Sequence, residues 1–269
     1  MARSDNYVLS GGDKGAQRLK LLAQTMWPTT KRLFHRLEVR PGLSCLDLGC
    51  GIGSVTLRLA RLVGSIGQVV GIDRDDRCLE LARKEAMRQK LNAIFQAKDA
   101  SELQEENIYD IAYSRFLLSH LPDPADAIKR LVRATRPGGL VVVEDIEFRA
   151  HFCYPACPAF DRYVSLYQQA VHRLGGDPNI GPRLVNLLMD TGLEEVGVEV
   201  VQPTFRQGTG KCIAQVTMEH IREAVVGAGL VSTAEAGSIV AELNQFARDT
   251  RTLLSVPRIF QVWGRKCHT

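Results

Sequence analysis

Net charge, aromatic residues and long apolar runs are all scarce in this 269-residue sequence. The 34 Lys and Arg residues exceed the 30 Asp and Glu residues by only four, an excess too small to indicate a nucleic-acid-binding surface. No segment approaches the roughly 20 consecutive apolar residues that cross a bilayer, so we expect no membrane insertion. Hydrophobic residues still make up 45% of the chain, which is ordinary for a globular protein with a normal core.

The sequence has an odd number of cysteines, and we expect no secretory signal. It has seven cysteines, and residues 1–15 contain no apolar stretch of the kind that directs export. We therefore expect reduced thiols and a cytoplasmic protein. His151, Cys153 and Cys157 have a spacing compatible with zinc, but no second Cys or His pair lies nearby in the sequence. We interpret them as packing residues and predict no bound metal.

Strand-like and helix-like segments alternate along the chain. Short apolar segments predict strands at residues 43–48, 68–72, 93–97, 108–113, 140–143, 193–201 and 256–264. Helical spacing is found at residues 16–36 (interrupted by Pro28), 54–63, 75–90, 160–174 and 181–191, after Asp123-Pro124, and within 217–249. This alternation predicts an α/β fold with a doubly wound, mainly parallel sheet.

The most informative segment joins the first predicted strand to the following helix. It begins at Asp47 and has glycines at positions 49, 51 and 53. Glycines let the backbone approach a ligand closely, and a helix N-terminus offers free N–H groups. A dinucleotide-binding loop would read G-x-G-x-x-G, which differs from this spacing. The acid at the end of the strand favours a ligand with a cationic amino group and a sulfonium over a pyrophosphate.

Acidic residues also follow the next two predicted strands. Asp73 ends the second strand, where a carboxylate can accept hydrogen bonds from both ribose hydroxyls. Asp99 follows the third strand, in position to face an adenine amino group, with the Ala100 N–H near a ring nitrogen. One acid at a strand end is ordinary, but two acids in register with a glycine loop predict a nucleoside-binding site.

These segments, together with residues 109–121 and 136–145, resemble the class I S-adenosylmethionine-dependent methyltransferases, in particular bacterial enzymes of the ubiquinone- and menaquinone-biosynthesis type. The resemblance is specific over residues 40–148. It implies a Rossmann-like sheet of seven strands with helical cap insertions, and S-adenosyl-L-methionine as the cofactor. The cofactor-binding residues that it implies, beside the acids above, are Tyr7 in a lid, Gly49, Cys50, Gly51 and Gly53 at the methionine and ribose, Arg74 at the adenine, and Ser114 at the methionine amino group.

We expect one domain over residues 1–269, because no linker interrupts the pattern. Its expected parts are an N-terminal helical lead-in and lid at 1–39, the cofactor-binding core at 40–148, helical substrate-cap segments at 149–192 and 205–252, and closing strands at 193–204 and 253–269.

The sequence gives less information about the methyl acceptor than about the cofactor. Methyl transfer from a sulfonium needs mainly alignment and exclusion of water, so a general base is required only for some acceptors. After the fourth strand the chain lacks both the double proline of nucleic-acid amino-methyltransferases and the carboxylate cluster of metal-dependent catechol-type enzymes. We predict a small-molecule acceptor and no nucleic acid, with His151 the first candidate base, Asp145 the second, and Arg115 nearby.

The sequence leaves several alternatives open. One is a methyltransferase that acts on protein or RNA, and another is a cofactor-binding regulatory protein without turnover. The acceptor atom and a homodimer are open as well.

Overall fold

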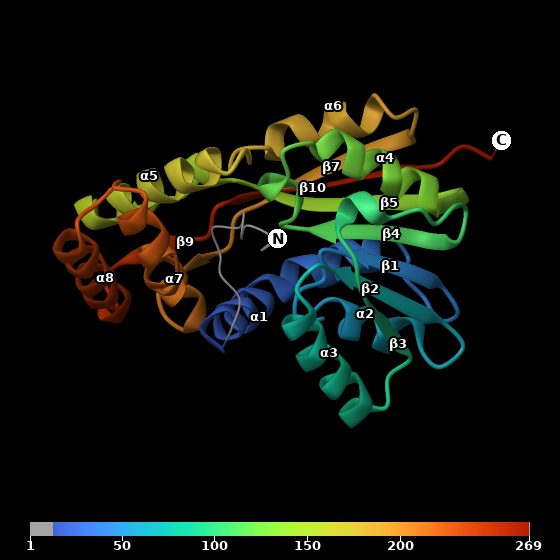
Figure 1. The fold of residues 1–269 in the computed structure, drawn as a ribbon, viewed down its shortest axis with the longest axis horizontal. Coiled ribbons are helices and arrows are strands. Elements are labelled where there is room, and N and C mark those ends of the chain that lie inside the picture. Colours follow the sequence, from blue (N-terminus) through green and yellow to red (C-terminus); the bar gives the residue numbers. More distant parts are fainter. Residues whose placement is uncertain (1–12, 269) are drawn as a thin grey trace, which may run out of the picture.

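The computed structural model describes residues 13–268, in which a large sheet carries helices on both faces (Figure 1). The strand order is β3-β2-β1-β4-β5-β10-β7. Strands β1 to β5 run parallel, and β10 is antiparallel to both β5 and β7. The bounds are β1 (Ser44–Leu48), β2 (Gln68–Asp73), β3 (Ala93–Ala97), β4 (Tyr109–Arg115), β5 (Thr135–Glu147), β7 (Glu194–Val201) and β10 (Arg258–Arg265). The predicted doubly wound sheet of seven strands is confirmed.

The central strands are apolar because both of their faces are buried. Leu46 and Leu48 of β1 pack in one core with α4 (Pro124–Ala134) and α6 (Leu184–Met189). Cys45, which points to the opposite face, packs in a second core with α1 (Asp13–Arg36) and α2 (Thr56–Val63). Helix α3 (Asp76–Gln89) covers the end of this second face, beside β3. The strand order changes direction between β1 and β4, and ligands of such sheets bind at the carboxyl ends on either side of that point.

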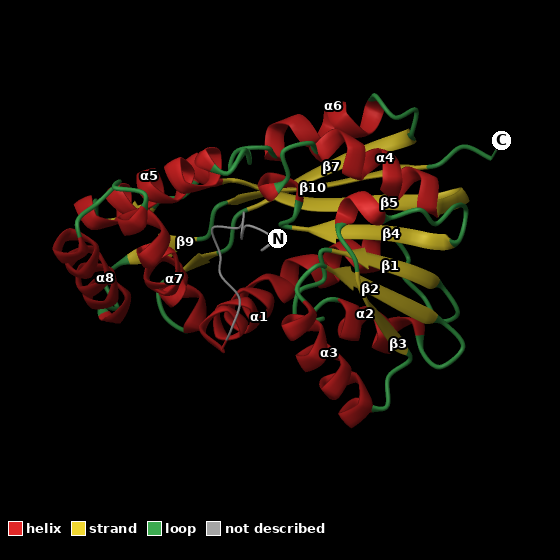
Figure 2. Cartoon of the chain, viewed as in Figure 1, coloured by secondary structure: helices red, strands yellow, loops and turns green. Residues whose placement is uncertain are grey.

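A helical cap follows the carboxyl end of β5 (Figure 2). Its helices α5 (Pro158–Arg173), α7 (Ile213–Gly227) and α8 (Thr233–Arg248) pack against one another around their own apolar core. A small antiparallel sheet, in the order β6-β9-β8, completes it with β6 (Cys153–Tyr154), β8 (Thr204–Phe205) and β9 (Leu253–Ser255). Short 3-10 turns connect the elements, namely η1 (Ala100–Glu102), η2 (Leu118–His120), η3 (Phe148–Ala150), η4 (Gly181–Arg183) and η5 (Thr209–Cys212).

Three features differ from the sequence-based expectation. Helix α1 continues through Pro28; Phe34 and Leu33, both buried beneath the sheet, hold its second half in place. Strand β5 runs from Thr135 to Glu147 and begins directly after α4, whereas the predicted strand covered only residues 140–143. The small sheet was missed because strands of two or three residues carry no measurable periodicity. Within residues 13–268, no helix combines the length and apolar character required to cross a bilayer.

Candidate active site

A tight glycine loop connects β1 to α2. Gly49, Gly51 and Gly53 have φ angles of 77°, 52° and 70°, a region that other residues adopt only at a cost. The Gly49 N–H donates to the Ile72 carbonyl at 2.8 Å, which fixes the loop against the end of β2. A Cβ atom on Gly53 would lie 2.8 Å from the Ala82 Cβ, so this glycine is also required by the packing of α3.

Asp73 lies at the end of β2, directly beside this loop. Its Oδ2 accepts the Gly51 N–H at 2.7 Å, and its Oδ1 accepts the Asp75 N–H at 2.9 Å. Burial raises the pKa of Asp73, and these two hydrogen bonds oppose the rise. A carboxylate oxygen can accept two hydrogen bonds, so each oxygen retains capacity for a hydroxyl. The arrangement fits the predicted contact with a ribose.

Asp47 and Cys50 face away from the open side of the loop. Asp47 is buried, and it accepts a hydrogen bond from the Thr56 hydroxyl at 2.6 Å, which ties β1 to the first turn of α2. Burial raises the pKa of Asp47 to about 6. The Cys50 side chain packs against β2, since a Cβ on Gly71 would lie 3.0 Å from the Cys50 Sγ. Burial raises the pKa of this thiol, and the Cys50 N–H donates to the Ile72 carbonyl at 3.0 Å.

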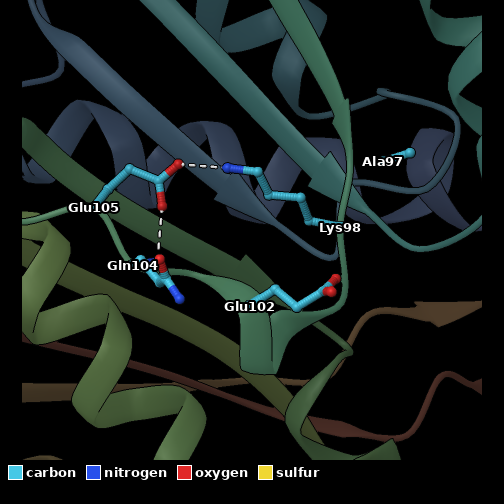
Figure 3. Close-up of a pocket in the computed structure, with 5 residues that line it drawn as sticks. All are labelled: Ala97, Lys98, Glu102, Gln104 and Glu105. Carbon is cyan, nitrogen blue, oxygen red and sulfur yellow. Dashed lines mark hydrogen bonds and ion pairs between the residues drawn. The ribbon is translucent and has the colours of Figure 1, made fainter.

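Asp99 and Ala100 form the start of η1. The Asp99 carboxylate accepts the Ser101 N–H at 2.9 Å, and the Glu102 carboxylate accepts the Asp99 N–H at 2.8 Å, a reciprocal capping box. An open pocket of about 600 Å³ adjoins this turn (Figure 3), lined by Ala97, Lys98, Glu102, Gln104 and Glu105. Lys98 and Glu105 form an ion pair across it at 2.9 Å. This pocket borders the predicted adenine end and contains no residue of the glycine loop.

The end of β4 carries a strained residue that the sequence did not reveal. Ser114 donates its hydroxyl to the Leu48 carbonyl at 2.9 Å, which joins β4 to β1. Phe116, two residues later, has φ 57°, while its N–H donates to the Glu144 carbonyl at 2.9 Å. Such conformations cost about 1–3 kcal/mol in a non-glycine residue and cluster at functional sites. Phe116 packs against the cap core, so it connects the strand end with the cap.

Asp145, predicted as a candidate base, holds the turn that follows β4. Its Oδ2 accepts the Ser119 N–H at 3.0 Å, and its Oδ1 accepts the Ile146 N–H at 2.9 Å. Burial raises its pKa to about 6. The turn η2 is also packed from outside, because a Cβ on Gly176 would lie 2.5 Å from the Ser119 carbonyl oxygen. These contacts assign Asp145 a positioning function, and its function as a base stays a prediction.

His151 lies inside the cap core. Its Nε2 is 2.6 Å from the Ser255 carbonyl oxygen, so this nitrogen carries the hydrogen and donates it. Burial lowers the pKa of His151 to about 3, so the ring is neutral, and Nδ1 has no hydrogen-bond partner among the described residues. The rings of Phe148, Phe160 and Tyr163 surround it.

The His151, Cys153 and Cys157 cluster was predicted not to bind metal. Residues 13–268 contain no group of three His, Cys, Asp or Glu side chains placed to hold a metal ion. The absence of a bound metal stays a prediction.

A buried polar network connects α1 with the sheet. Glu144 Oε1 accepts the hydroxyls of Thr30 at 2.8 Å and Tyr113 at 2.5 Å, and Oε2 accepts an amide hydrogen of Gln261 at 2.6 Å. Arg115 donates to the Thr30 hydroxyl at 3.1 Å. The structure therefore places Arg115, the third predicted catalytic residue, against α1, where its positive charge opposes the rise in the pKa of Asp47.

The first turns of α1 lie between the glycine loop and the cap. Ala16 packs with Ile52 of the loop, and a Cβ on Gly51 would lie 3.4 Å from the Leu19 Cδ1. On the cap side, Arg18 Nε donates to the Thr217 hydroxyl of α7 at 3.3 Å. Sequence reasoning missed Arg18 and Thr217 because an arginine on an amphipathic helix normally faces solvent.

Arg74 and Tyr7 are the two other predicted cofactor residues. Arg74 is exposed at the end of β2, and its charge, like that of Arg18, lowers the pKa of His120. It therefore lies on the side of the site that faces η2. Tyr7, the predicted lid residue, lies outside the described residues.

Comparison with known proteins agrees with this architecture. Residues 40–173 match a family model described as a methyltransferase domain. Demethylmenaquinone methyltransferase from Staphylococcus aureus is 33% identical over 147 residues, which are 54% of this chain and 58% of that enzyme. The chain thus matches less than two thirds of the length of such curated relatives.

Solved structures share the fold at low identity. The cyclase SpnF superposes with a TM-score of 0.57 at 21% identity, over 90% of this chain and 81% of SpnF. Phosphoethanolamine N-methyltransferase 2 from Haemonchus contortus, in complex with phosphomonomethylethanolamine and S-adenosylhomocysteine, gives 0.52 at 20% identity, over 97% of this chain and 54% of that chain. The sheet order, the glycine loop and the matched domain agree: residues 40–173 belong to the methyltransferase-domain family, and the sheet has the fold of the class I S-adenosylmethionine-dependent methyltransferases.

Proposed function

We propose that the chain transfers a methyl group from S-adenosylmethionine to a small, mainly apolar molecule held between the carboxyl ends of β4 and β5 and the cap. The observation that carries the proposal is the aromatic core that follows β5. Phe148 stacks on Tyr167 with ring centroids 3.8 Å apart, and Tyr163 packs edge-on to Phe148. These rings are buried in the cap core, and an acceptor that lies against this core would itself be mainly apolar. The name of the Staphylococcus aureus relative, a demethylmenaquinone methyltransferase, supports a quinone-like acceptor.

In this proposal the loop residues hold the cofactor. The backbone of Gly49, Cys50, Gly51 and Gly53 lies against its methionine and ribose, Asp73 accepts the ribose hydroxyls, and Asp99 with Ala100 contacts the adenine. When bound, the cofactor supplies an electrophilic methyl group on its sulfonium. The described residues add alignment and exclusion of water, which together lower the barrier of a bimolecular reaction by up to about 7–11 kcal/mol.

His151 is the better-placed of the two candidate bases. Its Nδ1 lone pair has no partner among the described residues, whereas both oxygens of Asp145 already accept backbone hydrogen bonds. Its pKa of about 3 lies well below neutral pH, where a general base is most effective, so burial weakens His151 as a base although its geometry is favourable. Activity that survives replacement of both residues by alanine would indicate an acceptor that needs no base.

The cofactor site is tested by calorimetric titration of S-adenosylmethionine. We expect Asp73→Ala to weaken binding by at least about tenfold, because it removes up to two charge-assisted hydrogen bonds of roughly 1.5–3 kcal/mol each. Asp76→Ala removes an exposed acid nearby and should leave the affinity unchanged. Wild-type affinity in Asp73→Ala would refute the assignment.

The acceptor is tested by release of S-adenosylhomocysteine from purified enzyme with reduced quinones, peptides or RNA. Turnover of a quinol supports the proposal. Turnover with only peptide or RNA supports the macromolecular alternative, and cofactor binding without turnover supports a regulatory protein. Once an acceptor is known, alanine substitutions at Arg115, Asp145, His151 and Tyr163 locate its site. Full activity and affinity in all four would place the acceptor elsewhere.

A further inference from the structure

We infer that Arg18 is an anion-binding residue of the acceptor site, so that the acceptor carries a negatively charged oxygen beside its apolar body. The inference rests on the proposed function, because the site is the one described above. It adds a chemical class to that proposal, namely aromatic or quinoid acceptors with a carboxylate, enolate or phenolate oxygen.

The position of Arg18 follows from its neighbours on α1. Ala16 and Leu19 touch the glycine loop, while Leu21 and Leu22 pack against the cap core. Arg18 lies on the same turns of α1, and its Nε donates to Thr217 of α7 at 3.3 Å. The guanidinium is therefore held against the cap, on a helix that also contacts the cofactor loop.

The neighbours of Arg18 that the structure describes include two titratable groups. Its charge acts on Tyr163 of α5 and on His120 of η2, lowering the pKa of each. Both groups are neutral at pH 7, because burial raises the pKa of Tyr163 and lowers that of His120 to about 3. Arg18 forms no ion pair with any described side chain, and its one hydrogen bond is to a neutral hydroxyl. A half-buried guanidinium with no anion beside it is a place for an anionic ligand.

The geometry of the guanidinium suits an oxygen anion. Arginine presents five N–H donors in a planar fork, which matches a carboxylate or a pair of neighbouring oxygens. The Thr217 hydroxyl fixes the Nε side, and the terminal nitrogens, which donate to no described residue, can contact a ligand. Tyr163 of α5, on which the charge of Arg18 acts, belongs to the buried aromatic core that would adjoin the apolar part of the same molecule.

The test compares two probes of one shape, 2-naphthoate and 2-naphthamide, titrated into the full chain saturated with S-adenosylhomocysteine. We expect wild-type protein to bind the carboxylate at least about tenfold more tightly than the amide. Arg18→Gln should bring the two affinities within about twofold while the amide affinity is retained. Lys20→Gln removes a positive charge from an exposed position two residues along α1 and should retain the preference for the carboxylate. Arg18→Lys, which keeps the charge but not the planar fork, should retain part of it.

The outcomes separate this inference from the proposed function. A preference that persists in Arg18→Gln, or equal binding of both probes to wild type, overturns the assignment of Arg18 and leaves the proposed function intact. Binding of neither probe, with S-adenosylhomocysteine still bound, overturns both. If circular dichroism shows that Arg18→Gln does not fold, Arg18→Lys takes its place. A preference for the carboxylate that is reduced in Arg18→Lys but unchanged in Lys20→Gln supports the inference. A preference that is unchanged in both variants overturns it.

Discussion

Replacing Gly53 by alanine perturbs the cofactor loop at a point where the structure gives two separate costs. The first is conformational: at φ 70° an L-residue is less favourable than glycine by about 1–2 kcal/mol. The second is steric, because the new Cβ would lie 2.8 Å from both the Ala82 Cβ and the Phe95 Cε1. Overpacking of this kind costs about 1–3 kcal/mol. We therefore expect Gly53→Ala to lower the free energy of unfolding by about 2–5 kcal/mol.

Gly192 provides the matched control. Its φ is 79°, but a Cβ there would meet nothing within 4 Å, so Gly192→Ala should lose only the conformational part, about 1–2 kcal/mol. Urea denaturation of both variants measures the difference, and titration with S-adenosylmethionine should show weaker binding only for Gly53→Ala. Equal destabilisation of the two variants would refute the reasoning that α3 and β3 close tightly on the loop.

Two further predictions concern buried polar groups. Thr30→Val should lower the free energy of unfolding by about 1–3 kcal/mol because it removes the hydroxyl between Glu144 and Arg115. Thr29→Val loses only a hydrogen bond to the Met26 carbonyl and should lower it less. Equal decreases in the free energy of unfolding, measured by urea denaturation, would contradict the network. Burial raises the pKa of Asp145 to about 6 from 3.8, so the folded state binds its proton more tightly than the unfolded state, and stability falls as pH rises from about 4 to 6. Asp145→Asn should reduce this decrease in stability, and the part that remains should come from Asp47, whose pKa burial also raises. An unchanged pH dependence of the free energy of unfolding would show that the pKa of Asp145 is not raised.

The sheet could be predicted from the sequence because its central strands are buried on both faces. Their apolar segments, such as residues 68–72, are continuous and separated by helical spacing. The small sheet of the cap could not be predicted, since β6 has only two residues. The passage of α1 through Pro28 was also missed, because tertiary packing of Phe34 outweighs a local preference.

The candidate site likewise has parts that the sequence could predict and parts that it could not. The glycine loop and Asp73 could be predicted because the residues that make them are contiguous or lie at successive strand ends. Arg18 and Thr217 are 199 residues apart, and no local pattern indicates that they meet. The backbone strain at Phe116 depends on the Glu144 carbonyl of a neighbouring strand, so the sequence alone could not reveal it.

The most direct test of the account is a crystal structure of the chain with S-adenosylhomocysteine. We predict that the ribose hydroxyls lie on the Asp73 carboxylate, that the backbone of Gly49 to Gly53 follows the methionine and ribose, and that the sulfur points toward the space between Arg18 and His120. A ligand bound away from Asp73 and the glycine loop, or a sulfur turned away from the cap, would contradict it.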